Sequence, residues 1–240
     1  MITNGFLDLG DGRVALTGPA LERWRRFDEQ FMAMARERGA EEIQFPSLVT
    51  RPTLDRAGYL ESFPDMACPV GENHLLMPAV CYQCYEHWSG QRLVAPQVVT
   101  CVGRCYRSEG GKFDVPGRLW EFTMREVVFV GPQLWVKEQR QEWMDRVSAF
   151  ALSQGIEAQM EPATDPFFCD ASRGKRLVQQ MKELKYELRA RSLALASFNL
   201  HEEHFTERFN ISLAGGAAAH TGCVAFGLER WAWTAMGGVT

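Results

Sequence analysis

The chain has 240 residues, of which 46% are hydrophobic and 23% are charged, and its formal net charge is −4. This composition fits one folded domain, excludes an intrinsically disordered chain and disfavours whole-surface attraction to nucleic acid. No apolar run approaches the roughly 18 residues that cross a bilayer, and the N-terminal residues lack signal-peptide features, so we expect a cytoplasmic protein without membrane contact.

The first half of the chain predicts a helix and a long hairpin. Apolar residues recur at helical spacing from Leu21 to Met34, and Gly39 ends this helix. The β-prone segment EEIQFPSLVT follows, and its Pro46 places it at a sheet edge or an interface. Residues 93–130 predict a long antiparallel hairpin, interrupted by the Gly-rich loop GGKFDVPG.

The second half predicts further helices and strands. Helices are expected at about 132–153 and 171–190, β structure at LALASFN and RFNISLA, and a last helix from GLERWAW. There is no internal repeat and no linker-like segment. Together these elements predict a single antiparallel α+β domain over residues 1–240.

Alternation along the hairpin places Glu126 on an apolar face. The same face carries Arg118, Trp120, Phe122, Met124 and Val128. A carboxylate in such surroundings needs a partner, which could be a salt bridge to Arg107 or Arg125, or a metal ion.

The hairpin spacing resembles motif 2 of class II aminoacyl-tRNA synthetases: an Arg-x-Glu strand, a Gly-rich loop, then Arg-x3-Phe-x3-Glu. AFGLER near the C-terminus resembles motif 3 of that class, and GAEEIQFPSL resembles motif 1. The motifs occur in the required order, at about 20–50, 101–130 and 221–237. The resemblance implies an antiparallel sheet flanked by helices, as in the class II synthetase catalytic domain.

This resemblance implies binding of ATP with Mg2+ and activation of an amino acid as its adenylate. Arg107 would contact the α-phosphate and the substrate carboxylate, and Arg230 the γ-phosphate, both as catalytic residues. Glu109 would accept from the adenine amino group and Phe122 would stack on the base. The implied ATP-binding set is Arg107, Glu109, Arg118, Phe122 and Arg230. Planar guanidinium groups suit bidentate phosphate contacts.

Within the class, the chain is most similar to seryl-tRNA synthetase cores. LLMPAVC aligns with the segment whose Thr and Glu contact the substrate amino group, and here Ala79 and Cys81 replace them. A zinc-dependent branch of that family binds the amino group on zinc through Cys, Glu and Cys. By this resemblance Cys81, Glu126 and Cys223 would hold one Zn2+ per subunit, with the fourth position left for substrate.

Other cysteine arrangements remain open. Seven cysteines favour burial, reactivity or ligation over a disulfide framework. A closed zinc site of Cys81, Cys84, Cys101 and Cys105 is an alternative, although two of these lie inside the motif 2 strand. Cys84 and Cys169 receive no role. His201 and His204 lack the zincin spacing and are interpreted as polar surface or pocket lining.

The substrate pocket is expected to include Ala79, Trp120, Met124, Asp165 and Asn199. Class II synthetases usually carry an acidic magnesium ligand on the strand before motif 3. LALASFN offers only Ser197 and Asn199 there, which leaves magnesium ligation by the protein open.

A seryl-like core with Cys, Glu and Cys resembles the amino acid:[carrier protein] ligases, through MPAVCY, MREVV, DPFF, the helix KELKYEL, SFNLHEEHF and HTGCVAFGLER. The family implies a homodimer that transfers a small amino acid, glycine or alanine, to the phosphopantetheine thiol of an acidic carrier protein. With no tRNA-binding domain expected, tRNA is disfavoured as acceptor. The alternatives are aminoacylation of tRNA or another protein, and a non-catalytic regulatory paralogue.

A basic helix over 171–191 is expected to dock the carrier, since opposite charges steer an encounter. Its proposed docking residues are Arg173, Lys175, Arg176, Lys182 and Lys185. A solvated helix face is the alternative reading of this charge.

Overall fold

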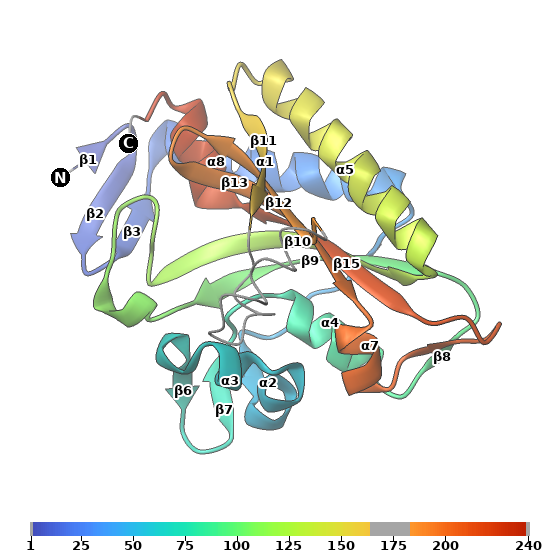
Figure 1. The fold of residues 1–240 in the computed structure, drawn as a ribbon. Helices are drawn as coiled ribbons and strands as arrows, with labels where there is room; N and C mark the ends of the chain where they lie inside the picture. Colours follow the sequence, from blue (N-terminus) through green and yellow to red (C-terminus); the bar gives the residue numbers. More distant parts are fainter. Residues whose placement is uncertain (1, 164–182, 239–240) are drawn as a thin grey trace.

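The computed structural model describes residues 2–163 and 183–238, and a seven-stranded sheet forms its centre (Figure 1). In spatial order the strands are β11 (Gln159–Ala163), β12 (Lys185–Ala190), β13 (Leu193–Glu202), β15 (His220–Gly227), β10 (Glu121–Gly131), β9 (Gln97–Tyr106) and β4 (Glu41–Glu42). Neighbours are antiparallel except β4, which runs parallel to β9. The predicted antiparallel α+β fold is confirmed.

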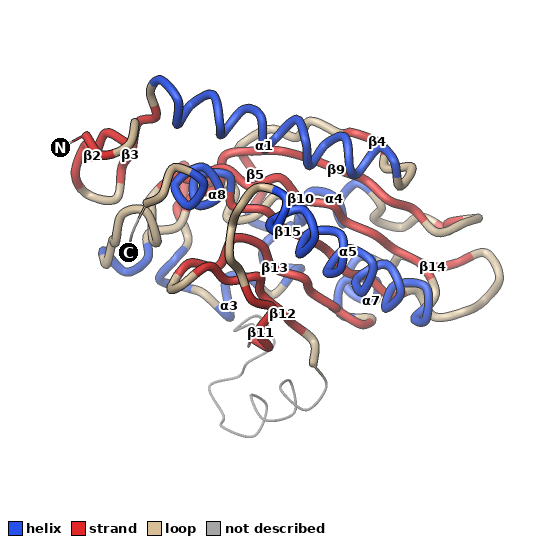
Figure 2. The backbone as a smooth tube through the Cα atoms, turned by 90° about the horizontal axis from the view of Figure 1, so that it is seen from above, coloured by secondary structure: helices blue, strands red, loops and turns tan. Residues whose placement is uncertain are grey.

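Three helices cover one face of this sheet: α1 (Gly18–Glu37), α5 (Gln133–Ser153) and α8 (Leu228–Ala235), as Figure 2 shows from above. The buried stripe of α1 includes Phe27 and Phe31 at helical spacing. Phe31 stacks on Phe226 of β15, with ring centroids 4.0 Å apart. Burial of these large aromatic groups fastens the predicted first helix to the sheet.

Smaller elements cover the opposite face. They are α2 (Arg51–Ala57), α3 (Tyr59–Ser62), α4 (Cys81–His87), α7 (His204–Phe209) and a small sheet of β5 (Leu48–Thr50), β7 (His74–Leu76) and β6 (Cys68–Val70). Short 3-10 turns lie at Pro64–Met66 and Glu109–Gly111, and β8 (Arg92–Leu93) pairs with β14 (Ser212–Leu213). A second apolar core fills the space between this layer and the sheet.

The N-terminal strands β1 (Ile2–Thr3), β2 (Phe6–Gly10) and β3 (Arg13–Leu16) form a separate small sheet beside α8 (Figure 1). The Phe6 ring meets Trp233 of α8 edge to face, with centroids 4.9 Å apart. Within the described ranges, no helix is long and apolar enough to span a membrane.

Two secondary-structure predictions were wrong in part. Residues 185–190 form strand β12, although a helix over 171–190 was predicted; residues 171–182 lie outside the described residues. KYELRA alternates, so that Leu188 and Ala190 enter the helix-covered core while Lys185 and Glu187 take the other face. The expected strand RFNISLA instead ends α7 at Phe209 and leaves only Ser212–Leu213 as β structure.

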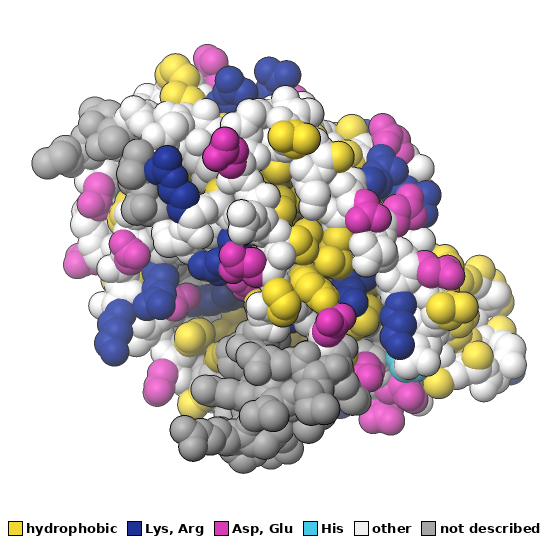
Figure 3. Space-filling view, turned by 45° about the horizontal axis from the view of Figure 1, so that its top comes forward, with side chains coloured by type: hydrophobic (Ala, Val, Ile, Leu, Met, Phe, Trp, Pro, Cys, Tyr) yellow, Lys and Arg dark blue, Asp and Glu magenta, His cyan; other side chains and the backbone are white. Residues whose placement is uncertain are grey.

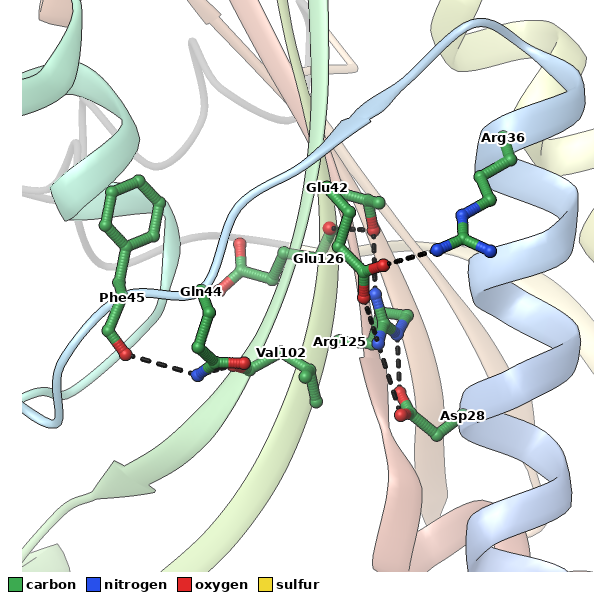
Figure 4. A network of polar contacts seen from close by, with 9 residues as sticks. Asp28, Arg36, Glu42, Gln44, Phe45, Val102, Arg125 and Glu126 are labelled. Carbon is green, nitrogen blue, oxygen red and sulfur yellow. Dashed lines mark hydrogen bonds and ion pairs between the residues drawn. The ribbon is translucent and has the colours of Figure 1, made fainter.

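Arg125 ties the first helix to the sheet (Figure 4). Its guanidinium is 1% exposed and pairs with both carboxylate oxygens of Asp28 on α1. It also donates to Glu42 of β4 at 3.4 Å and to the Thr100 hydroxyl at 3.2 Å. Glu126 points away from Arg125 in the figure, so the salt bridge between these two neighbours is not formed.

Arg125→Met is expected to lower the free energy of unfolding by about 3 kcal/mol, because it leaves Asp28 and Glu42 without their buried cation. Arg36→Met is the matched control: Arg36 also pairs with Glu42, at 2.8 Å, but its side chain is 58% exposed, so the expected loss is under about 1 kcal/mol. Urea unfolding measures both. Equal losses of unfolding free energy in the two variants would show that the buried ion pairs of Arg125 stabilise the fold no more than the exposed pair of Arg36.

Candidate functional site

A cavity of about 350 Å³ opens between the sheet and the α4–α7 layer. Its walls bring together strand β10 with the loop that joins it to β9, strands β12, β13 and β15, and the start of α8. Register explains this convergence: Glu126, Ala225, Ser197 and Glu187 are paired across four adjacent strands and all line the cavity. The next row towards α4 brings Cys223, Asn199 and Lys185 together in the same way.

One end of the cavity carries two arginines. The Arg107 guanidinium lies over the Phe122 ring at 5.1 Å, and its Nε donates to the Pro78 carbonyl at 3.0 Å. Arg230 donates to the carbonyls of Gly117 and, at 2.9 Å, Ala194. Burial and the nearby charge of Arg107 lower the pKa of Arg230. Since two guanidinium groups repel each other in one cavity, an anion between them would be stabilised.

The remaining members of the predicted ATP-binding set, Glu109, Arg118 and Phe122, line the same cavity. Glu229 lies next to Arg230 and was missed in the sequence. Its carboxylate accepts from the Thr123 backbone N–H at 2.8 Å and from Trp24 Nε1 at 3.2 Å, and burial raises its pKa. These contacts fasten the start of α8, and with it Arg230, to β10 and α1.

The other end of the cavity carries Cys81, Glu126 and Cys223, which come from α4, β10 and β15. A Glu126 oxygen accepts from the backbone N–H of Val80 at 2.8 Å and of Cys81 at 3.4 Å. Burial raises the pKa of Glu126, and the Val80 N–H opposes that shift. A hydrogen bond with Cys223, burial and the Glu126 charge raise the pKa of the Cys81 thiol. The two thiols and the carboxylate therefore lie together in one buried part of the cavity, here called the pole, which consists of Cys81, Glu126 and Cys223.

These three side chains are the expected zinc ligands. Within residues 2–163 and 183–238, no group of three or more His, Cys, Asp and Glu side chains is placed so that it could hold a metal ion. The Glu126 carboxylate is directed to backbone N–H groups instead. Two thiols and one carboxylate in one cavity nevertheless match the donor types that zinc prefers, so the residues fit the ion in their chemistry.

Three further cysteines, Cys84, Cys101 and Cys105, are not among the residues that line the cavity. Cys84 and Cys101 are fully buried and touch each other, with their sulfur atoms 3.6 Å apart. Cys105 is also fully buried, in the apolar core behind the cavity. The closed four-cysteine alternative is therefore not assembled in the described residues. Cys169 lies outside them.

Of the predicted substrate-pocket residues, Ala79, Met124 and Asn199 line the cavity. Trp120 is not among the lining residues, and its ring packs edge to face on Phe113. Asp165 lies outside the described residues. Aromatic lining from Tyr59, Tyr82 and Phe205 was not anticipated, because these residues lie outside the three synthetase motifs.

His201 lines the cavity beside Cys223 and is buried, so it is pocket lining rather than surface. Its place two residues after Asn199 is a signal in the sequence, although a register irregularity between Leu200 and Glu202 interrupts the pairing of β13 there. Burial lowers the pKa of His201 to about 3, which keeps the ring neutral. His204 faces elsewhere, with Nε2 3.1 Å from the Ala57 carbonyl.

The predicted carrier-docking residues fall into two groups, according to whether the structure describes them. Arg173, Lys175, Arg176 and Lys182 lie outside the described residues. Lys185 lies on strand β12 and lines the cavity, with Nζ 3.4 Å from Glu187, so its placement on a docking helix was wrong. On the described part of the face in Figure 3, Lys and Arg side chains are interspersed with Asp and Glu.

Similar folds occur in solved seryl-tRNA synthetases. The structure superposes on the SerRS of M. kandleri in complex with A. aeolicus tRNASec with a TM-score of 0.80, at 21% identity, covering 98% of this chain and 55% of that one. For the Pyrococcus horikoshii enzyme complexed with ATP, the TM-score is 0.78 at 15% identity, covering 94% and 53%. These likenesses show the fold, and this chain spans about half the length of those proteins.

Sequence similarity identifies the family, although no family model matches the chain. The chain is 25% identical to the type-2 serine–tRNA ligase of Methanocaldococcus jannaschii, covering 92% of this chain and 52% of that protein. It is 30% identical to amino acid–[acyl-carrier-protein] ligase 2 of Bradyrhizobium diazoefficiens, covering 92% and 75%. Ligase 1 of the same organism is 33% identical, covering 82% and 71%. The chain belongs to the amino acid–[acyl-carrier-protein] ligase family, which is related to the type-2 serine–tRNA ligases.

Proposed function

We propose that the protein uses ATP to activate a small amino acid and transfers it to the phosphopantetheine thiol of an acyl-carrier protein. The observation that carries this proposal is a single cavity with two arginines at one end and two thiols with a carboxylate at the other. Two relatives named as amino acid–[acyl-carrier-protein] ligases support the acceptor. An alternative, tRNA as acceptor, is favoured by the similarity to the type-2 serine–tRNA ligases.

In the first step a carboxylate oxygen of the amino acid attacks the α-phosphorus of ATP, and pyrophosphate leaves. Arg107 and Arg230 would neutralise the phosphate charge and hold the reactants in line, which is how proteins accelerate phosphoryl and nucleotidyl transfer. Phe122 and Glu109 would hold the adenine base, and Mg2+ would arrive with ATP. In the second step the carrier thiol attacks the carbonyl carbon, AMP leaves, and the thiol proton is released.

Cys81, Glu126 and Cys223 would hold a zinc ion that, when bound, supplies a Lewis-acid site for the substrate's neutral amine. The walls of the cavity include the bulky side chains of Met124, Tyr82 and Phe205, and the family resemblance favours glycine or alanine as the substrate. On the family resemblance alone, we also propose a cytoplasmic homodimer whose interface includes motif 1.

Amino-acid-dependent exchange of pyrophosphate into ATP should be strongest with glycine or alanine, because bulky side chains such as Met124, Tyr82 and Phe205 line the cavity. A panel that also contains serine, leucine and phenylalanine measures this, and a reaction without amino acid sets the background. Exchange with leucine or phenylalanine but not with glycine or alanine would contradict the small pocket. Exchange with no amino acid would favour the non-catalytic paralogue.

A further inference from the structure

The sulfur of Cys223 faces two nitrogen groups of β13. Asn199 Nδ2 lies 3.3 Å from the sulfur and His201 Nε2 lies 3.6 Å from it. Asn199 pairs with Cys223 across β13 and β15, and His201 stands two residues later at a register irregularity between Leu200 and Glu202, from which its side chain also lines the cavity. The sequence-derived ligand set contained Cys223 but neither of these neighbours.

The His201 ring is held from its other side. Its Nδ1 lies 3.1 Å from the Tyr85 hydroxyl and 3.2 Å from the Thr221 hydroxyl. The ring is 6% exposed and packs edge to face against Phe205, with centroids 4.9 Å apart. A neutral imidazole carries one N–H, so when Nδ1 accepts from a hydroxyl, the proton resides on Nε2 and points at the sulfur. This tautomer is assigned from the partners.

Asn199 is the less constrained of the two donors. Its Nδ2 is shared between Cys223 and, at 3.4 Å, the Ser197 hydroxyl. Its buried Oδ1 has no hydrogen-bond partner in the part of the chain that the structure describes. The amide is thus anchored at one end only, whereas hydroxyl groups of two different elements fix the His201 ring.

We propose that His201 is a positioning residue. Its Nε2–H donates to the Cys223 sulfur and directs that sulfur towards Cys81, within the pole that would bind the substrate's amine. The inference rests on the proposed function, in which Cys223 is a zinc ligand. Groups that hydrogen-bond to a metal ligand orient it, and their removal weakens metal binding or activity about 10- to 100-fold. His201 would therefore affect zinc and the amino acid, but not ATP.

Zinc affinity of the metal-free protein, measured by competition with a chromogenic chelator, tests the role directly. His201→Ala is expected to bind zinc about 10- to 100-fold more weakly. His201→Gln is expected to recover most of the loss, because its amide N–H occupies nearly the place of Nε2. The matched control is His204→Gln, three residues on and turned to Ala57, which should bind like the wild type.

Two further readouts separate positioning from general damage. The KM for the amino acid should rise in His201→Ala, while the KM for ATP stays unchanged. In the Co2+ form of the protein, the thiolate-to-metal absorption should weaken in His201→Ala and return in His201→Gln. Equal zinc affinity in His201→Ala and wild type would overturn the inference, and so would an equal loss in His201→Ala and His201→Gln.

The failure of the inference can be distinguished from the failure of the proposed zinc site. Wild-type protein that binds no zinc, or zinc binding that survives Cys223→Ser, refutes the zinc site itself. Zinc binding that Cys223→Ser removes and His201→Ala leaves intact refutes only the role of His201.

Discussion

Cys81→Ser is expected to abolish zinc binding and to lower amino-acid-dependent pyrophosphate exchange about 1000-fold, whereas Cys84→Ser keeps both. Cys81 lines the cavity and forms a hydrogen bond with Cys223, so its loss removes one of the three proposed ligands. A Lewis-acid site contributes several kcal/mol to charge stabilisation, and about 1.4 kcal/mol corresponds to a tenfold change in rate.

Cys84 is the matched control because it belongs to the same helix and the same C-x-x-C segment. Its sulfur is fully buried against Cys101, outside the residues that line the cavity. Its replacement therefore affects packing alone. The comparison is made by measuring the zinc content with mass spectrometry and the rate of pyrophosphate exchange. Equal losses of zinc and of exchange in Cys81→Ser and Cys84→Ser would contradict the predicted difference.

Arg107→Ala is expected to lower the exchange rate about 1000-fold even at saturating ATP, because a cation that contacts the transferring phosphate stabilises charge in the transition state. The side chain is already placed for this: its guanidinium lies over Phe122 and its Nε is held by the Pro78 carbonyl. Arg107→Lys keeps the charge but not the planar fork, and should recover only part of the rate.

Arg104 provides the control, from strand β9, which ends one residue before Arg107. Its side chain is 50% exposed, pairs with Glu121 at 3.1 Å and only distantly with Glu229, at 3.9 Å, and is not among the residues that line the cavity. Arg104→Ala should therefore exchange within a factor of a few of the wild type. If the rate of pyrophosphate exchange at saturating ATP is the same in Arg107→Ala and Arg104→Ala, the assignment of Arg107 to the phosphate-binding end of the cavity is wrong.

Much of the nucleotide end could be predicted from the sequence because local rules determine it. A Gly-rich loop between two alternating strands specifies a hairpin, and alternation assigns Phe122, Met124 and Glu126 to one face. Those three side chains do line one cavity with Arg107 and Arg230. The spacing of residues within one hairpin thus carries most of the geometry of this end.

The opposite wall could not be predicted, because it depends on contacts between distant segments. KYELRA contains enough Lys, Glu and Arg to suggest a solvated helix, yet pairing with β13 makes it a strand that places Lys185 and Glu187 in the cavity. An acidic magnesium ligand is expected on the strand before motif 3, whereas in the structure Glu187 stands beside Ser197 on the neighbouring strand β12. Tertiary pairing overrides local preference here.

The partners of Glu126 could not be predicted from the sequence either. Burial of its carboxylate was expected, as was the need for a partner. The groups that bind it are backbone N–H groups of Val80 and Cys81, more than 40 residues earlier in the chain. A sequence pattern reports side-chain types and cannot show which backbone amides will face a buried acid.

Transfer of a labelled amino acid tests the central claim most directly. The protein is incubated with ATP, labelled glycine or alanine, and in separate reactions a carrier protein with its phosphopantetheine arm, the same carrier without the arm, or tRNA. The account predicts label on the carrier that has the arm, bound as a thioester that hydroxylamine releases, and none on the other two. Label on tRNA, or equal label on both carriers, would contradict it.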